Sequence, residues 1–233
     1  MVLVMGLSDI LLVSLVGGLM ALDRTAAFQF MISRPIVAGP VIGLTLGEPA
    51  AGVAMGALIE LVWISRLPLG GKVPPNESLG AIVGTAAVII AAPRGEPPGR
   101  ELLALGFLCV PPVAHLAALL ETRLRRLNAL LAARARKAVK TGRPDRLNRL
   151  NLAGLALSLA GIYLYIMSAL LLIVPLLAAL RPRLPESLRT ALEITYFCLP
   201  LLGVAAALSN MNVKRADLVF ALFFGGVFLF LSL

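Results

Sequence analysis

Charged residues are scarce in this chain of 233 amino acids: Asp, Glu, Lys and Arg together make up 14% of it. A soluble domain carries about 25%, so the composition argues against a water-soluble fold. Cysteine occurs only at Cys109 and Cys198, both in apolar stretches without metal-ligand spacing, which indicates neither a disulfide nor a metal centre. The one histidine, His115, follows two prolines in an apolar stretch, and we expect it to be a buried core residue.

Catalytic motifs are missing as well. The sequence holds no Walker A loop, which argues against ATP hydrolysis by this chain itself. It also lacks a metal-ligand spacing, a Ser/His/Asp set, and a Cys or His placed to carry a phosphoryl group. We therefore predict that the chain is not an enzyme and has no cofactor, and that any chemistry coupled to it comes from a partner protein.

Apolar residues, by contrast, are abundant. They make up 59% of the chain, and the mean hydropathy is +0.94. They are concentrated in long runs, so the lipid bilayer is the expected solvent, and the chain has room for roughly six to eight spanning or half-spanning segments. We predict an all-α integral membrane protein that forms a single domain over residues 1–233.

Several runs in the first half are short and interrupted. The pieces at 36–48 and 50–66 hold only about 12 to 17 apolar residues, too few to cross a bilayer unaided. Such Gly/Pro-interrupted segments are typical of the broken helices of transporters, where irregular backbone lines a cavity. Glycines spaced four apart allow helices to approach closely, and they recur here as Gly39, Gly43 and Gly47, as Gly52 and Gly56, and as Gly80 and Gly84. The pattern predicts a multi-helix bundle with broken or re-entrant half-helices.

Positive charge is concentrated in one segment. The net charge is +9, and about half of the Lys and Arg fall at 121–151, between two apolar regions. The positive-inside rule makes this segment a basic cytoplasmic loop, lying against anionic lipid headgroups or, alternatively, offering a docking surface to a soluble partner. Aromatic residues are not interleaved with the basic ones, so no nucleic-acid partner is predicted.

Polar residues inside the apolar regions are the candidate binding site. Glu60 has apolar neighbours on both sides, and because an unpaired carboxylate in hydrocarbon costs at least a few kcal/mol, it should face the bundle interior or a cavity. A structural salt bridge to Arg34 or Lys72 is the rival interpretation. Trp63 lies on roughly the same helical face, where an aromatic ring suits the apolar face of a sugar; an anchor at the membrane interface is the alternative. The predicted substrate-binding residues, which suit a polyhydroxylated ligand, are Asp23, Gln29, Arg34, Glu60, Lys72 and Asn76.

Residues 22–86 resemble the membrane-embedded IIC component of the mannose/fructose/sorbose family of the bacterial sugar phosphotransferase system. Four features carry the resemblance, in this order: Leu22-Asp23, the Arg34-Pro35 pair that opens a glycine-spaced run to Gly47-Glu48, the segment Gly56 to Glu60, and the loop Gly71 to Pro75. Asp23, Arg34 and Glu60 match the family pattern and Gln29 matches loosely, whereas Asn76 stands where an aspartate is usual.

The resemblance implies a sugar-translocating subunit in the bacterial cytoplasmic (inner) membrane, with several membrane passes. It implies a second membrane subunit, IID, that encloses a hexose jointly with this chain, and a trimer of IIC–IID pairs surrounded by membrane lipid. Soluble IIA and IIB proteins would phosphorylate the sugar, which accounts for the missing phosphoryl-carrying histidine.

Two alternatives remain at this point. The chain could be an ion-coupled secondary transporter with Glu60 as the coupling carboxylate. It could instead be a divergent, non-transporting membrane scaffold with a regulatory role. Dependence on IIA and IIB, on an ion gradient or on neither separates the three interpretations.

Overall fold

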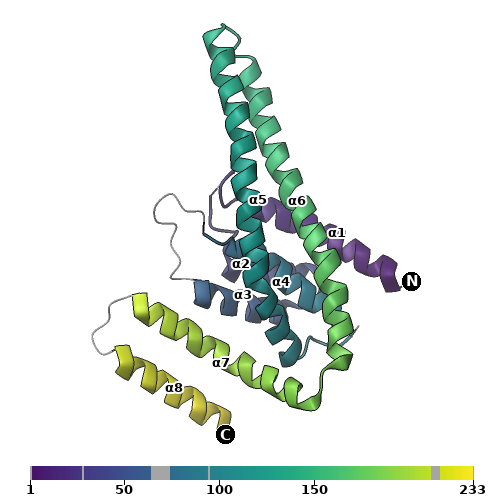
Figure 1. The fold of residues 1–233 in the computed structure, drawn as a ribbon, viewed down its shortest axis with the longest axis vertical. Helices are drawn as coiled ribbons and strands as arrows, with labels where there is room; N and C mark the ends of the chain where they lie inside the picture. Colours follow the sequence, from purple (N-terminus) through teal and green to yellow (C-terminus); the bar gives the residue numbers. More distant parts are fainter. Residues whose placement is uncertain (1, 28, 64–73, 94, 211–215, 233) are drawn as a thin grey trace.

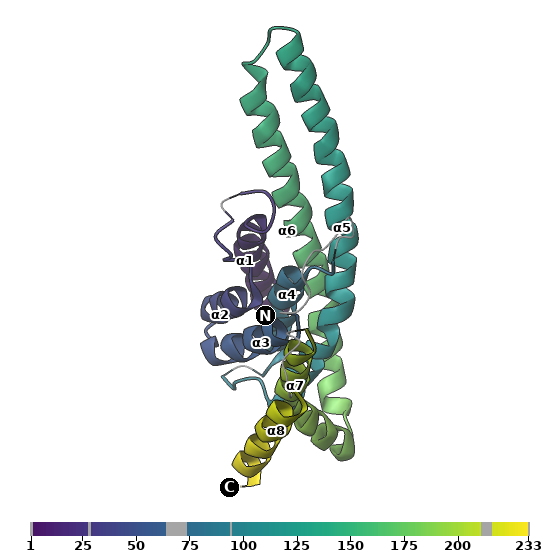
Figure 2. The same cartoon turned by 90° about the vertical axis from the view of Figure 1, so that its left-hand side faces the viewer.

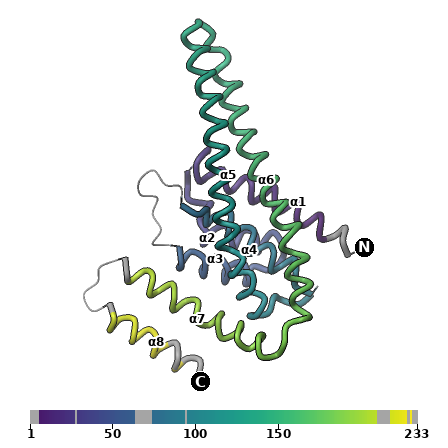
Figure 3. Tube along the Cα trace, in the orientation of Figure 1, coloured from purple at the N-terminus to yellow at the C-terminus, as the bar shows by residue number. Residues whose placement is uncertain are grey.

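The computed structural model describes residues 2–27, 29–63, 74–93, 95–210 and 216–232, and the regular structure in these ranges is helical (Figure 1). The elements are α1 (Val2–Leu22), α2 (Pro35–Thr45), α3 (Pro49–Trp63), α4 (Glu77–Ala91), α5 (Arg100–Lys140), α6 (Arg146–Leu180), the 3-10 turn η1 (Arg181–Arg183), α7 (Glu186–Asn210) and α8 (Ala216–Ser232). The trace in Figure 3 follows them from the N-terminus to the C-terminus.

Helix length divides the molecule. Helices at Arg100–Lys140, Arg146–Arg183 and Glu186–Leu208 are long and apolar enough to cross a membrane. The helices α2, α3 and α4 have 11, 15 and 15 residues, and at 1.5 Å per residue they are shorter than the roughly 30 Å hydrocarbon layer. The prediction of an all-helical membrane protein with short front-half segments is therefore confirmed.

The glycines spaced four apart join α2 and α3 into a tight pair, which we call the glycine hairpin (residues 35–63). A Cβ atom built at Gly39 would lie 2.5 Å from the carbonyl oxygen of Gly52, and one built at Gly43 would lie 2.8 Å from the Cα of Gly52. The two backbones are thus in direct contact, which only residues without a side chain allow. The turn between the helices contains Gly47 at φ +81°, a left-handed conformation that favours glycine.

The helix α4 is the centre of the packed body. Its residues from Ser78 to Ile89 are all buried, and Figures 1 and 2 show it between the glycine hairpin and the long helices α5 and α6. Gly80 and Gly84 face Val110 of α5, because a Cβ at either position would lie within 3 Å of a Val110 methyl group. These contacts position the first turn of α4, which carries polar groups of the site.

The basic segment 121–151 is helical rather than an irregular loop. The helix α5 continues to Lys140 and α6 begins at Arg146, so the connection between them is short and contains Gly142 at φ +69°. Ala, Leu, Arg and Lys, which dominate this segment, are strong helix formers. The paired helices project beyond the rest of the molecule (Figure 2), and we call residues 121–151 the basic hairpin.

The expectation that His115 is a buried core residue is wrong: its side chain is exposed on α5. The inward face of this part of the helix consists of Val110, Val113, Ala114 and Ala117, which are all buried. The residue at 115 lies on the opposite side of the helix from this stripe, because helical neighbours repeat every three to four residues.

Candidate functional site

The glycine hairpin brings the first pair of predicted site residues together. Arg34 immediately precedes α2, Glu60 lies in the last turn of α3, and their side chains form an ion pair. The second carboxylate oxygen of Glu60 accepts a hydrogen bond from the backbone N–H of Ile36 at 3.4 Å. The carboxylate therefore sits at the N-terminus of α2, where unpaired N–H groups and the helix dipole favour negative charge.

Burial of this pair is uneven. The side chain of Glu60 is 14% exposed and that of Arg34 is 39% exposed. The guanidinium can thus reach a ligand or water while it compensates the charge of the carboxylate. Of the two possible salt-bridge partners named for Glu60, the structure shows Arg34; Lys72 lies outside the described residues.

Trp63 lies at the end of α3, three residues after Glu60. Its ring packs edge-on against Phe107 of α5, with a centroid distance of 6.4 Å. The indole N–H is buried and has no hydrogen-bond acceptor among the described residues. Buried polar groups normally have a partner, and the described residues supply none for this donor.

Asp23, one of the predicted substrate-binding residues, contacts the backbone of the loop that follows it. Its side chain is almost fully buried, with 2% of the residue exposed, and it accepts hydrogen bonds from the backbone N–H of Phe30 at 2.6 Å and of Ser33 at 3.3 Å. These bonds hold a loop in which Gln29 and Met31 adopt positive φ angles of 59° and 65°, a rare conformation outside glycine that surrounding contacts must sustain. Asp23 therefore shapes the loop between α1 and α2.

A second set of polar side chains joins that loop to α4 and α5, and we call it the junction cluster: Arg24, Asn76, Glu77, Glu121 and Arg125. Arg24 forms an ion pair with Glu77, and its Nε atom lies 3.8 Å from a carboxylate oxygen of Glu121. Glu121 also pairs with Arg125 on the next turn of α5. Two arginines thus face two glutamates, and the charges in the cluster balance.

Asn76 is the amide in this cluster. Its side-chain oxygen accepts the N–H of Leu79 at 3.0 Å and so caps α4, while its amide nitrogen donates to Glu121 at 3.2 Å. Its backbone N–H donates to the carbonyl oxygen of Ala114 on α5 at 2.8 Å. Asn76 is therefore fully engaged with the protein, and it fixes the start of α4 against α5.

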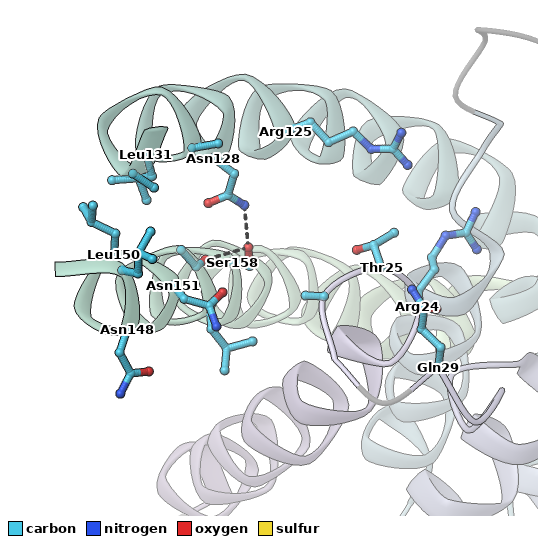
Figure 4. Close-up of a pocket in the computed structure, with 16 residues that line it drawn as sticks. Arg24, Thr25, Gln29, Arg125, Asn128, Leu131, Asn148, Leu150, Asn151 and Ser158 are labelled. Atoms are coloured by element: carbon cyan, nitrogen blue, oxygen red, sulfur yellow. Dashed lines mark hydrogen bonds between the residues drawn. The ribbon is translucent and has the colours of Figure 1, made fainter. Parts of the chain in front are cut away.

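Two cavities adjoin the junction cluster. The large cavity has a volume of ≈ 1020 Å³ and lies between the loop after α1 and the facing surfaces of α5 and α6 (Figure 4). The small cavity, of ≈ 50 Å³, lies next to it and reaches Asn76 and Glu121. Both are lined by Arg24, Thr25, Arg125, Asn128 and Ser158. Gln29 lines the large cavity only.

The six predicted residues therefore do not form one site in the part of the chain that the structure describes. Arg34 and Glu60 are paired with each other, Asn76 belongs to the junction cluster, and Gln29 borders the large cavity. Asp23 supports the loop. Lys72 is outside the described residues.

Sequence reasoning missed Arg24 and Glu121 as partners in the junction cluster. Arg24 follows Asp23 at the end of a long apolar run, and Glu121 is the first charged residue after the apolar part of α5. Each position marks a charge at the edge of an apolar segment, but the pairing across 97 residues depends on how the helices pack. Among the described residues, no three His, Cys, Asp or Glu side chains are grouped so as to hold a metal ion.

Comparison with known proteins gives one consistent family. The family model described as the sorbose-specific IIC component of the PTS (phosphotransferase system) matches residues 7–232. The sorbose-specific EIIC component of Klebsiella pneumoniae is 27% identical over 189 residues, which are 80% of this chain and 67% of that protein. A putative N-acetylgalactosamine permease IIC component of Escherichia coli K12 is 50% identical over 56 residues, which are 24% of this chain.

The match to the Escherichia coli protein spans only 42% of that protein's length. Among solved structures, a mannose transporter determined by cryo-electron microscopy in complex with microcin E492 has the same fold, with a TM-score of 0.60. It is 19% identical, and the alignment covers 95% of this chain and 85% of the other.

Proposed function

The chain belongs to the family of sorbose-specific IIC components of the phosphotransferase system, and we propose that it is the subunit through which a hexose crosses the bacterial membrane. The observation that carries the proposal is the Arg34–Glu60 pair at the meeting point of two short, glycine-packed helices. Ionisable side chains in an apolar membrane body are rare, pair with one another as these two do, and mark the pathway of a polar substrate or ion.

The chemistry of this pair suits a sugar. A carboxylate accepts hydrogen bonds from hydroxyl groups, a guanidinium donates them, and charge-assisted bonds of this kind are about twice as strong as neutral ones. The exposed part of Arg34 would meet the sugar first. Trp63 supplies an aromatic ring and a buried N–H without an acceptor among the described residues. Sugar specificity would come from which hydroxyls these three groups can reach.

Partners follow from the same proposal. The chain would pair with a IID membrane subunit that completes the sugar pathway, and the pairs would assemble as a trimer. Soluble IIA and IIB proteins would supply the phosphoryl group, because the only histidine of this chain, His115, lies in an apolar stretch of α5. The phosphorylated IIB protein would meet the sugar on the side of the membrane that carries the basic hairpin.

The test is sugar binding to the chain purified with its IID partner. Calorimetric titrations would use mannose, glucose, fructose, sorbose and N-acetylgalactosamine as probes. Glu60→Gln keeps the shape of the side chain but removes the charge, so we expect one sugar to bind saturably and its affinity to fall at least about tenfold in this variant. Glu96→Gln, at an exposed position between α4 and α5, is the matched control.

If Glu60→Gln and Glu96→Gln bound the sugar with equal affinity, Glu60 would not be part of the sugar site. Sugar uptake into vesicles distinguishes group translocation from ion-coupled transport. A group-translocating subunit needs phosphorylated IIB and is insensitive to ionophores, whereas an ion-coupled transporter would lose uptake when the gradient is collapsed.

A further inference from the structure

Half of the residues that line the large cavity have neutral hydrogen-bonding or cationic side chains and the other half are aliphatic or glycine, and the proposed function above assigns the cavity no role. Its lining residues include two arginines, Arg24 and Arg125, and no aspartate or glutamate is among those that the structure describes around it. A volume of ≈ 1020 Å³ is at the top of the range of roughly 300–1,000 Å³ for small-molecule sites. The cavity is therefore large enough for a soluble metabolite, and the polar half of its lining can form hydrogen bonds with one.

The electrostatic environment favours an anion. Arg24 is engaged by Glu77 and lies close to Glu121, but the side chain of Arg125 is 58% exposed and forms one short bond through a single terminal nitrogen to Glu121. A guanidinium has five N–H groups, so most of those of Arg125 can face the cavity. The basic hairpin around it holds ten Lys and Arg and only Glu121 and Asp145 as acidic residues, which raises the local concentration of anions.

The neutral side of the cavity favours hydroxyl groups. The amide nitrogen of Asn128 on α5 donates to the hydroxyl oxygen of Ser158 on α6 at 2.9 Å, across the gap between the two helices. The amide oxygen of Asn128 is buried and has no donor among the described residues. A Cβ atom at Gly154 would lie 3.2 Å from this oxygen, so the missing side chain leaves the amide room. An acceptor in this position needs a donor, which a hydroxyl group supplies and a phosphate dianion does not.

Both kinds of group lie along one cavity. Figure 4 shows Asn128 and Ser158 joined between the helices, with Thr25 of the loop and the guanidinium groups of Arg125 and Arg24 to the right of this pair. We propose that the large cavity binds a phosphate ester that also carries hydroxyl groups, with the phosphate on Arg125 and the hydroxyls on Asn128 and Thr25. Two sources have this chemistry: a soluble hexose phosphate and the phosphoglycerol headgroup of an anionic lipid.

The hexose phosphate is the source that the position of the cavity favours. The cavity borders Gln29 of the polar loop and shares five lining residues with the small cavity at Asn76, and it lies at the base of the basic hairpin, on the side where phosphorylation would occur. The ligand would then be the product of the sugar-phosphorylating system, held before it is released. This last step rests on the proposed function, whereas binding of the phosphate ester does not.

The experiment uses the complex of the chain with its IID partner in nanodiscs of zwitterionic lipid. Mannose 6-phosphate, glucose 6-phosphate, inorganic phosphate and the free sugars are titrated by calorimetry. The variants are Arg125→Gln, which removes the exposed charge, and Asn128→Leu, which removes the amide. Arg126→Gln is the matched control, because Arg126 is an exposed arginine on the same helix and lines neither cavity.

We expect a hexose phosphate to bind more tightly than inorganic phosphate, with an affinity that falls about tenfold in Arg125→Gln and changes less than about twofold in Arg126→Gln. Asn128→Leu should reduce the preference for the hexose ester over inorganic phosphate. Glu60→Gln should leave this binding unchanged while it weakens binding of the free sugar, so a failure of one site does not imply a failure of the other.

A second titration in nanodiscs that contain phosphatidylglycerol identifies the source of the ligand. Loss of hexose phosphate binding there, with the lipid retained by the wild type and released by Arg125→Gln, would assign the cavity to the lipid headgroup. Unchanged hexose phosphate binding would assign it to the soluble product. The proposal is overturned if neither ligand binds. It is also overturned if Arg126→Gln weakens binding as much as Arg125→Gln, because the overall positive charge of the hairpin, and not the cavity, would then account for the binding.

Discussion

The packed body, which contains α4 and the glycine hairpin, differs from the basic hairpin in burial and in charge. In the body, α4 is buried along its length from Ser78 to Ile89, and the glycine hairpin brings two backbones into direct contact. In the basic hairpin, residues 141–149 are all exposed. The hairpin holds ten of the 21 Lys and Arg, and the rest of the chain is nearly neutral, with 11 basic and ten acidic residues.

This difference separates two kinds of sequence constraint. A position in the body is restricted by shape, because no side chain fits between contacting backbones. An exposed position of the hairpin outside the junction cluster and the two cavities is restricted mainly by charge and helix propensity, which many residues satisfy. The junction cluster lies where the two regions meet, and there both constraints apply to the same residues.

The largest effect is expected in the glycine hairpin. In Gly52→Val, the new Cβ would lie 2.5 Å from the carbonyl oxygen of Gly39, and a backbone atom cannot move aside as a side chain can. Overpacking of this kind costs about 3 kcal/mol or more, so we expect the complex to lose its thermal transition or fail to assemble. Size-exclusion chromatography and thermal unfolding of the purified complex measure this.

Gly6→Val in α1 is the control for that experiment, because a Cβ at Gly6 meets no atom within 4 Å. If the two valine variants melted at the same temperature, the close approach of α2 and α3 would not be a feature of the folded protein. The difference between the body and the hairpin would then lose its physical basis.

An intermediate effect is expected at the junction. Asn76 donates from its amide to Glu121 at 3.2 Å, so Asn76→Asp replaces an attraction with two facing carboxyl groups. We expect a loss of about 2 kcal/mol at neutral pH, the value of a hydrogen bond to a charged group. Repulsion raises the pKa of the introduced carboxyl in the folded state. The lost stability should therefore return as the pH falls below that pKa, the opposite of ordinary acid destabilisation.

The matched control removes the second charge. In the double variant with Glu121→Gln, the introduced carboxylate faces an amide donor and still caps α4, so stability at neutral pH should recover and its dependence on pH should flatten. Thermal unfolding of the three proteins from pH 8 down to about pH 4, the ordinary pKa of an aspartate, measures this. A single variant as stable as the wild type at neutral pH would show that Asn76 and Glu121 do not meet.

The sequence was sufficient to predict features that depend on neighbouring residues. The four-residue spacings of Gly39, Gly43 and Gly47 and of Gly52 and Gly56 predicted close helix packing, and the apolar neighbours of Glu60 predicted a buried charge with Arg34 as a possible partner. The junction cluster was not predictable, because the pairing of Arg24 with Glu121 depends on the packing of α1, α4 and α5. The hydrogen bonds from the loop backbone to Asp23 were not predictable either, since the sequence does not show the positive φ of Gln29 and Met31.

The smallest effect is expected at the end of the basic hairpin. Arg134 is exposed on α5 and lines neither cavity, so Arg134→Gln should change the free energy of unfolding by less than about 0.5 kcal/mol. The same variant should nevertheless lower the affinity for any partner that binds the hairpin through its positive charge. The loss of affinity should be larger at low salt than at high salt. The free energy of unfolding and the affinity for IIB, measured on one preparation, show whether the variant changes stability or binding. A large loss of stability without a change in binding would mean that Arg134 packs within the assembled complex, and the hairpin would then be constrained by shape, as the body is.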